Sequence, residues 1–258
     1  MTELEPLLAL AGDLAAEAAG LSLERLGEPR SRVRTKSSAT DMVSEVDEAC
    51  ERLIVDGIRR ERPGDGVLSE EGASAETTTG VRWVVDPIDG TTNYLYGHPG
   101  YGISIAVEVD GETAVGVVHD PLHGDRFAAV RGGEATRNGE PIRVSDETEL
   151  GSALIATGFA YAAAERVAQA RVLAGVIGSI RDVRRMGAAA VDLCSVACGR
   201  VDGYYERGLK RWDLAAGSLI AATAGARISE LDDGTVIAAA PGVYDALRAA
   251  LLAARPEA

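Results

Sequence analysis

The sequence predicts an α/β (or α+β) protein, and three features of the chain support this class. Short apolar runs typical of strands are mixed with longer segments of helical spacing along the whole length. No internal repeat or low-complexity linker interrupts them. The 258 residues, 46% of them apolar, suffice for one large unit or for two small domains that share a site.

The first half of the chain contains two predicted helices, followed mainly by strands. Helical spacing covers residues 3–26 and ends at Gly27, a residue typical of helix C-caps. A second helix is predicted at 40–61, before Pro63 and Gly64. Strands are predicted at 82–86, 101–109, 113–120 and 126–130. Asp110-Gly111, between the second and third of these strands, indicates a hairpin turn.

Beyond Arg143 strands and helices alternate. Strands are predicted at 153–157, 201–205, 226–229 and 236–239, and helices at 162–173, 188–197, 212–224 and 243–254. Cys50, Cys194 and Cys198 do not form a disulfide framework or a zinc site, so we expect buried structural thiols. None of His98, His119 and His123 has metal-ligand spacing, so we expect structural roles for them.

Composition excludes several classes of protein. The net charge is −14, which argues against nucleic-acid binding through a broad basic surface. The sequence contains no run of about 18 uninterrupted apolar residues, so a membrane-spanning helix is not expected. The N-terminus lacks the basic region of a secretory signal, so a cytoplasmic protein is predicted. If such an acidic protein handles phosphate, metal ions are the obvious source of positive charge.

The most informative segment runs from Asp86 to Asn93, with the sequence DPIDGTTN. A predicted strand delivers Asp86, and Pro87 is expected to end that strand. Asp89 follows closely enough for both carboxylates to face one point. Gly90 and the threonines after it are expected to open a helix whose free amides attract anions. Two hard oxygen ligands beside an anion site indicate a place for Mg²⁺ and a phosphoryl group. The alternative is an Asp-Pro turn in which Asp89 caps the helix.

Other acids could belong to the same site, although each has a simpler interpretation. Glu70 follows the apolar pair Val67-Leu68 and could lie in a solvated turn. Asp213 stands where a helix N-cap belongs. Asp47 could lie on an inward helix face, whereas Asp41 could cap that helix.

Four blocks of sequence are similar to those of the inositol monophosphatase family. In chain order they are KSSATDMVSEVD, SEEG, WVVDPIDGTTNY and YYERGLKRWDLAAG, and together they span nearly the whole chain. The resemblance implies a layered αβαβα sandwich of the inositol monophosphatase and fructose-1,6-bisphosphatase type. It also implies a half at 1–144 that carries most metal ligands and a half at 145–258 that carries Asp213 and the substrate loop.

The resemblance further implies a cluster of carboxylates that holds two or three Mg²⁺ ions. The first ion would be held by Glu70, Asp86 and the carbonyl of Ile88, and the second by Asp86, Asp89 and Asp213. Without metal these acids would repel one another, so a loose site is expected. Glu70 would also approach a third ion through water. By the same resemblance, Glu70, Thr91 and Asp47 would activate water, and the amides of Gly90 and Thr91 would bind phosphate. Lys36 matches a family lysine on a loop near the third ion.

Substrate recognition is implied elsewhere in the chain. Glu206 matches the family position that binds sugar-like hydroxyls, and Gly187 and Ala188 match the loop that contacts the inositol ring. Many relatives carry Ser or Thr where this chain has Ala188, so a hydroxyl contact is lost there. The run Arg181, Arg184 and Arg185 is expected to form a solvated or interface face, or else to guide an anionic substrate.

The resemblance thus implies a cytoplasmic, Li⁺-sensitive homodimer that hydrolyses a small phosphate ester, first of all inositol monophosphates. The alternatives are the same chemistry on histidinol phosphate, fructose 1,6-bisphosphate or 3′-phosphoadenosine 5′-phosphate, or a non-catalytic regulatory protein of the same fold. The short YYERGLKRWD segment favours a polyol over a nucleotide.

Overall fold

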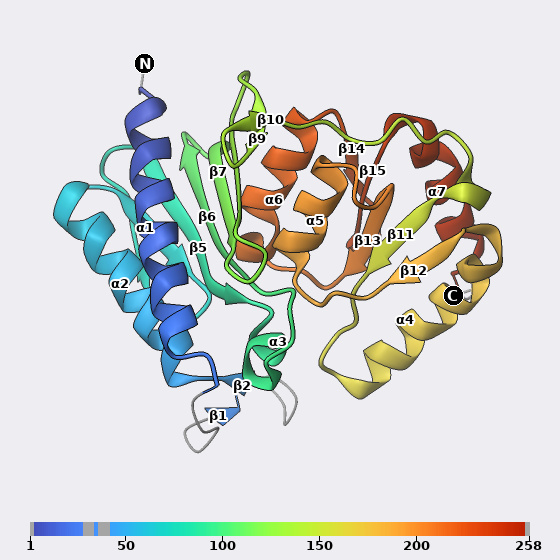
Figure 1. The fold of residues 1–258 in the computed structure, drawn as a ribbon, viewed down its shortest axis with the longest axis horizontal. Helices are drawn as coiled ribbons and strands as arrows, with labels where there is room; N and C mark the ends of the chain where they lie inside the picture. The colour runs from blue at the N-terminus through green and yellow to red at the C-terminus, as the bar shows by residue number, and fades with distance from the viewer. Residues whose placement is uncertain (1–2, 28–33, 36–41, 256–258) are drawn as a thin grey trace.

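The computed structural model describes residues 3–27, 34–35 and 42–255. Two mixed sheets stand side by side, with helices between them and on both outer faces (Figure 1). The order of layers is helix, sheet, helix, sheet, helix, which confirms the αβαβα prediction.

The first sheet is built from strands of the first half of the chain. In spatial order they are β10 (Glu140–Pro141), β9 (Ala135–Arg137), β8 (Asp125–Val130), β7 (Glu112–Asp120), β6 (Gly102–Val109), β5 (Val81–Asp89), β3 (Gly66–Ser69) and β4 (Ser74–Ala75). Neighbours are antiparallel except β3 and β5, which run parallel. Helices α1 (Glu5–Glu24) and α2 (Glu45–Glu61) cover the outer face and share a large apolar core with the sheet.

The second sheet has the spatial order β12 (Asp182–Arg184), β11 (Leu154–Thr157), β13 (Gly203–Arg207), β15 (Thr235–Ala239) and β14 (Arg227–Glu230). Its outer face carries α4 (Ala163–Val176) and α7 (Pro241–Ala253). Between the two sheets lie α5 (Ala189–Ala197) and α6 (Arg211–Thr223), which are packed against each other. Small side chains dominate this middle layer, among them Ala188, Ala190 and Ala216, and let the helices approach both sheets closely.

Shorter elements complete the described chain. They are the paired strands β1 (Arg34–Thr35) and β2 (Met42–Val43), the helix α3 (Thr91–Tyr96), and the 3₁₀ turns η2 (Leu150–Ser152) and η3 (Ile177–Ser179). The Asp110-Gly111 hairpin turn is confirmed, since both residues have positive φ and join β6 to β7.

Helix α1 is long and apolar enough to cross a membrane, judged by length and composition alone. Here it packs against α2, β6 and β7. Its buried residues are Leu7, Ala11, Leu14, Ala15, Ala18, Ala19 and Ser22. These contacts are those of a core helix, and they account for its apolar composition.

Two predicted boundaries are wrong. Helix α2 begins at Glu45 rather than at residue 40, because Ser44 caps it and Met42–Val43 pairs as a strand. Strand β5 does not end at Pro87 but continues to Asp89. Its pairing with β6 shifts between Asp86 and Asp89, so Pro87 occupies an irregular stretch where a missing N–H is tolerated.

The three cysteines are free, as predicted. Cys50 and Cys194 are buried, and Cys198 is half-buried. His123 contacts the buried carboxylate of Asp120 at 2.7 Å through Nδ1.

Candidate active site

The irregular end of β5 places Asp86 and Asp89 together. Residues three apart in a regular strand point to opposite faces of the sheet, but an extra residue in one strand re-aims the side chains after it. Here three steps on β5 match two on β6. Both carboxylates are buried, and the charge of Asp89 contributes to the raised pKa of Asp86. Oδ1 of Asp86 also accepts a hydrogen bond of 3.1 Å from the Ile88 N–H.

Gly90 forms the turn from β5 into α3. Its φ of 90° lies in the left-handed region that favours glycine. A Cβ at this position would stand 2.9 Å from the Gly100 carbonyl oxygen and 3.1 Å from the Cβ of Ala188. Gly90 is therefore required both by its backbone conformation and by close packing against the loop before α5.

Asp47 and Thr91 join α2 to the DPIDGTTN segment. Asp47 is fully buried at the third position of α2, where its Oδ2 accepts a hydrogen bond of 3.0 Å from the N–H of the capping residue Ser44. The Thr91 hydroxyl lies 2.7 Å from Asp47 Oδ1 and 3.1 Å from the Ile88 carbonyl oxygen. One hydroxyl thus connects an acid of α2 with the turn after β5.

Glu70 and Asp213 approach the same place from other elements. Glu70 directly follows β3, and its N–H donates to the Val85 carbonyl at 3.2 Å, beside Asp86. Asp213 lies at the third position of α6, not at the N-cap, and its Oδ2 accepts from the Lys210 N–H at 2.6 Å. The charges of both acids contribute to the raised pKa of Asp86.

The acids of this cluster resist ionisation. Burial, followed by repulsion from Glu70, Asp89 and Asp213, raises the pKa of Asp86 well above its usual range. Burial and the charge of Asp213 do the same for Asp89. The pKa of Asp213 rises to about 7, chiefly through burial, although the residue is only partly buried from solvent. At neutral pH these three acids therefore favour a bound proton or cation over an unneutralised carboxylate.

The donor set of the cluster suits a hard divalent cation. Carboxylate oxygens of Glu70, Asp86, Asp89 and Asp213, with the Ile88 carbonyl, are the ligand types that Mg²⁺ prefers. Within residues 3–27, 34–35 and 42–255, however, no three Asp, Glu, His or Cys side chains already form a ready-made metal cage. Several of these acids instead accept hydrogen bonds from backbone amides. The residues fit the ion, and small side-chain movements would be needed to close around it.

The loop before α5 lies against the DPIDGTTN segment. Asn93 donates through Nδ2 to the carbonyl oxygens of Gly100 and Met186, both at 2.6 Å. The Ala190 N–H donates to Asp89 Oδ2 at 2.6 Å. Gly187, with φ 90°, and the buried Ala188 are thereby held against the DPIDGTTN segment.

Glu206 lies on β13, facing α5, and accepts a 2.7 Å hydrogen bond from the Tyr204 hydroxyl. Burial raises its pKa, which the charge of Arg185 partly offsets. The predicted residues Lys36 and Asp41 lie outside the described residues.

Sequence reasoning missed Asp192, an acid of α5 that is completely buried. Its charge acts on both Asp89 and Tyr204, so it lies near both the acid cluster and β13. The available signal was a single acid inside the apolar run AAVDLC.

Comparison with known proteins identifies relatives that match nearly the whole chain. The model of the inositol monophosphatase family matches residues 3–257. The chain is 45% identical to the inositol-1-monophosphatase SuhB of Mycobacterium tuberculosis, over 95% of this chain and 93% of that protein. It is 40% identical to the Nus factor SuhB of Pasteurella multocida, over 89% of this chain and 90% of that protein.

A solved structure shows the same fold. The extragenic suppressor protein suhB of Bartonella henselae superposes with a TM-score of 0.91 at 33% identity, covering 96% of this chain and 98% of the other. The layered fold and the family match across nearly the full length lead to one conclusion. The chain belongs to the inositol monophosphatase family.

Proposed function

We propose that this protein is a Mg²⁺-dependent phosphomonoesterase that hydrolyses inositol monophosphates to inositol and phosphate. The observation that carries the proposal is the cluster of acids Glu70, Asp86, Asp89 and Asp213 beside the Gly90 turn, in which burial and neighbouring charges raise the pKa of the three aspartates. Such a cluster suits a site that collects cations in order to bind an anionic ester. The names of the inositol-1-monophosphatase relatives add support.

The proposed ligands are Glu70, Asp86 and the carbonyl of Ile88 for one ion, and Asp86, Asp89 and Asp213 for a second. Two to three Mg²⁺ ions, when bound, would neutralise phosphate oxygens and lower the pKa of coordinated water. The amides of Gly90 and Thr91 would hold the phosphate in place.

Thr91 and Asp47 would handle the proton of the attacking water. The Thr91 hydroxyl donates a hydrogen bond to Asp47 Oδ1 at 2.7 Å, so the threonine oxygen can accept a hydrogen bond from water while its own proton points to Asp47. Glu70 would orient the same water from the end of β3. The rate enhancement would then come mainly from positioning and electrostatics.

We also propose that Glu206, Gly187 and Ala188 contact the alcohol part of the ester. The hydrogen bonds from Asn93 and Ala190 support this, because they hold that loop next to the acid cluster. A cytoplasmic homodimer with no nucleic-acid or membrane partner remains our prediction, supported by the net charge of −14. Lys36 is proposed as a loop residue near a third ion.

The proposal is tested by phosphate release from a panel of esters in Mg²⁺. The panel contains inositol 1-phosphate, histidinol phosphate, fructose 1,6-bisphosphate and 3′-phosphoadenosine 5′-phosphate. We expect the highest kcat/KM on inositol 1-phosphate, with inhibition by Li⁺. The variant Asp86→Asn should lose at least about 100-fold in kcat, because it removes a charge from the centre of the cluster. The control Asp56→Asn changes an exposed acid of α2 and should leave activity unchanged.

If the protein hydrolyses another ester of the panel but no inositol phosphate, that ester becomes the proposed substrate. A regulatory function is the second candidate, because relatives at 40% identity bear the name Nus factor. It would rank first if the purified protein with Mg²⁺ hydrolysed none of the esters.

A further inference from the structure

Asp192 is an unexpected acid in the layer between the sheets. It is 0% exposed, among the apolar side chains of α5. Neither carboxylate oxygen makes a hydrogen bond of normal geometry within the described residues. Burial, followed by the charge of Glu206, raises the pKa of Asp192 well above its usual range, and the charge of Arg185 and the Gly187 N–H oppose this only in part. An unpaired buried carboxylate disfavours folding, so a neutral side chain would suit the helix better. The reason for an acid here is more readily found in the neighbouring substrate loop.

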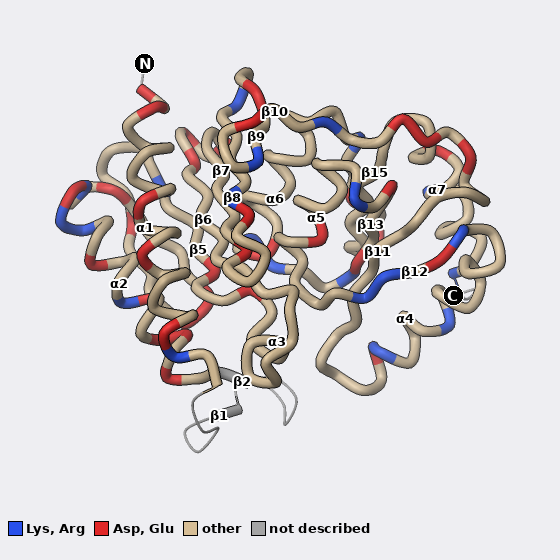
Figure 2. Tube along the Cα trace, viewed as in Figure 1, with Lys and Arg blue, Asp and Glu red and all other residues tan. Residues whose placement is uncertain are grey.

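Arg185 is the positively charged residue whose charge acts on Asp192. It follows β12 and precedes the loop at Gly187, within the basic stretch drawn in blue beside β12 (Figure 2). Its guanidinium covers Gly187: a Cβ on that glycine would stand 2.0 Å from Nη1. The charge of Arg185 acts on both Asp192 and Glu206.

Arg185 keeps its donors uncommitted. In the part of the chain that the structure describes, it forms no ion pair, whereas its neighbour Arg184 pairs with Asp182 at 2.8 Å. A guanidinium presents five N–H donors in a rigid fork. The donors of Arg185 therefore lie over Gly187, from where the charge of the guanidinium acts on Glu206.

We propose that Arg185 is a specificity-determining residue. With Glu206, it recognises the hydroxyl groups of a phosphate monoester whose alcohol part is an uncharged polyol. This assignment rests on the proposed function. Arg185 donates to hydroxyl oxygens, and Glu206 accepts from hydroxyl protons. Asp192 is a positioning residue: its buried carboxyl group lies near the Gly187 N–H, and the charge of Arg185 favours its ionised form.

The charge balance selects against the alternative esters. The charge of Arg185 favours the ionised form of Glu206, which would repel a second phosphate group. The ammonium group of histidinol phosphate would meet Arg185 instead. Replacing Arg185 by a neutral residue leaves the two acids without their cation, and that change should favour a cationic substrate.

The test compares kcat and KM for inositol 1-phosphate and histidinol phosphate in Mg²⁺. For Arg185→Gln we expect KM for inositol 1-phosphate to rise about tenfold, with a smaller change in kcat. The selectivity, as the ratio of the two kcat/KM values, should shift at least about tenfold toward histidinol phosphate. Arg185→Lys should recover part of the selectivity, because it restores the charge but not the fork. The matched control Arg184→Gln should leave both ratios unchanged.

Asp192→Asn tests the positioning role. It should raise KM for inositol 1-phosphate in the same direction, and the double variant with Arg185→Gln should be no worse than Arg185→Gln alone. Additive effects in that cycle would overturn the role of Asp192. Selectivity within about twofold of the unsubstituted protein for Arg185→Gln, or an equal shift in Arg184→Gln, would overturn the role of Arg185. If the unsubstituted protein hydrolyses neither ester, the proposed function itself fails and this assignment falls with it.

Discussion

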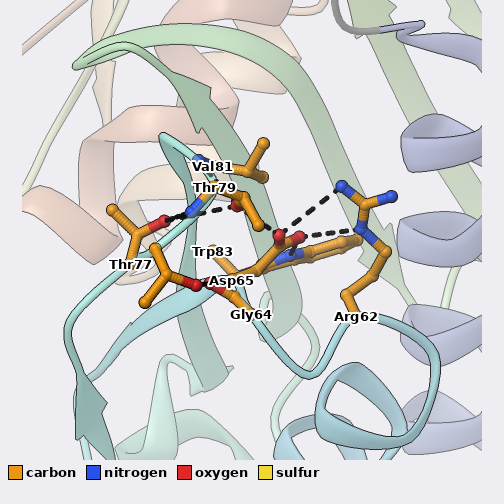
Figure 3. Close-up of polar contacts among 8 residues, drawn as sticks. Arg62, Gly64, Asp65, Thr77, Thr79, Val81 and Trp83 are labelled. Atoms are coloured by element: carbon orange, nitrogen blue, oxygen red, sulfur yellow. Dashed lines mark hydrogen bonds and ion pairs between the residues drawn. The ribbon is translucent and has the colours of Figure 1, made fainter.

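Asp65 joins the end of α2, the loop before β5 and strand β5 itself through one carboxylate. It lies just before β3 with its side chain 1% exposed (Figure 3). Oδ2 accepts hydrogen bonds from Arg62 Nε at 2.9 Å and Trp83 Nε1 at 3.0 Å, and Oδ1 accepts from the Thr79 hydroxyl at 2.6 Å. Although burial opposes ionisation, these three donors together lower the pKa of Asp65. The ionised form is therefore the one that stabilises the fold.

Asp65→Asn should weaken this connection in a pH-dependent way. Because the pKa of Asp65 is lower in the folded protein, its contribution is present above the unfolded value of about 3.9 and is lost as pH falls through the folded value. We expect the variant to lose about 1–3 kcal/mol of unfolding free energy in urea, equally at pH 7 and pH 5. The difference should shrink only below about pH 4. A difference that already shrinks between pH 7 and pH 5 would contradict this account, and Asp56→Asn, an exposed acid, serves as the control.

Helix α6 is anchored to the first sheet by a buried acid. Glu108 on β6, with its side chain 1% exposed, accepts from Arg82 Nε at 2.7 Å and from Arg211 Nε at 2.6 Å. Arg211 also donates to the Thr113 hydroxyl at 2.6 Å. Because Arg211 is the first residue of α6, this anchor fixes the helix end that carries Asp213.

Arg211→Met should therefore affect both stability and activity. We expect a loss of about 1–3 kcal/mol in unfolding free energy, because Glu108 keeps Arg82 but loses one charged donor. Displacement of the α6 N-terminus should also lower phosphate release. The control Arg143→Met breaks an exposed pair with Asp146, in which both side chains are about four-fifths exposed, and should cost no more than about 0.5 kcal/mol. Equal losses for the two variants, measured by urea unfolding, would show that the anchor adds nothing beyond a surface pair.

Elements with local signals were predictable from the sequence, whereas those that depend on distant partners were not. The β6–β7 hairpin and helices α5 to α7 follow from apolar periodicity and turn residues, which act within a few positions. Strand β12 exists only because β11, far away in sequence, offers it a parallel partner. In the same way, the continuation of β5 past Pro87 depends on its bulged pairing with β6.

The candidate site shows the same division. The spacing of Asp86 and Asp89 predicts two neighbouring carboxylates, and the structure brings Glu70 and Asp213 to them. The position of Asp213 at the third residue of α6 was not predictable from its neighbours alone, because Lys210 is not a typical cap. Asp192 could not be recognised from the sequence for a related reason. Its burial without a side-chain hydrogen bond, among the residues that the structure describes, results from tertiary packing.

On the scale of the whole molecule, hydrogen bonds at the site connect the two halves of the chain. Asn93 and Asp89 of the first half bond to Met186 and Ala190 of the second. Away from the site, Arg200 pairs with the buried Asp125 of β8 at 2.6 Å. The middle-layer core also contains residues of both halves. Because contacts near the acids hold the halves together, the charge state of the cluster should influence global stability.

Magnesium removal should make that stability depend on pH. The pKa of Asp213 is about 7 in the folded protein, against about 3.9 when unfolded. Its contribution is fully present below the unfolded value and is lost as pH rises through 7. In EDTA, the unsubstituted protein should therefore lose about 2 kcal/mol relative to Asp213→Asn between pH 5 and pH 8, after allowance for partial exposure.

Magnesium should reverse this loss, because ionised carboxylates bind the cation more tightly than protonated ones. Thermal midpoints measured from pH 5 to pH 8 in EDTA and in excess MgCl₂ provide the comparison. We expect the midpoint of the unsubstituted protein to rise with Mg²⁺, most strongly at pH 8, and the rise to be smaller for Asp213→Asn. If Mg²⁺ shifts both proteins equally at every pH, the acids do not form a cation site. If Mg²⁺ raises the midpoint of the unsubstituted protein alone, the carboxylates that repel one another in EDTA are the same groups that bind the ion.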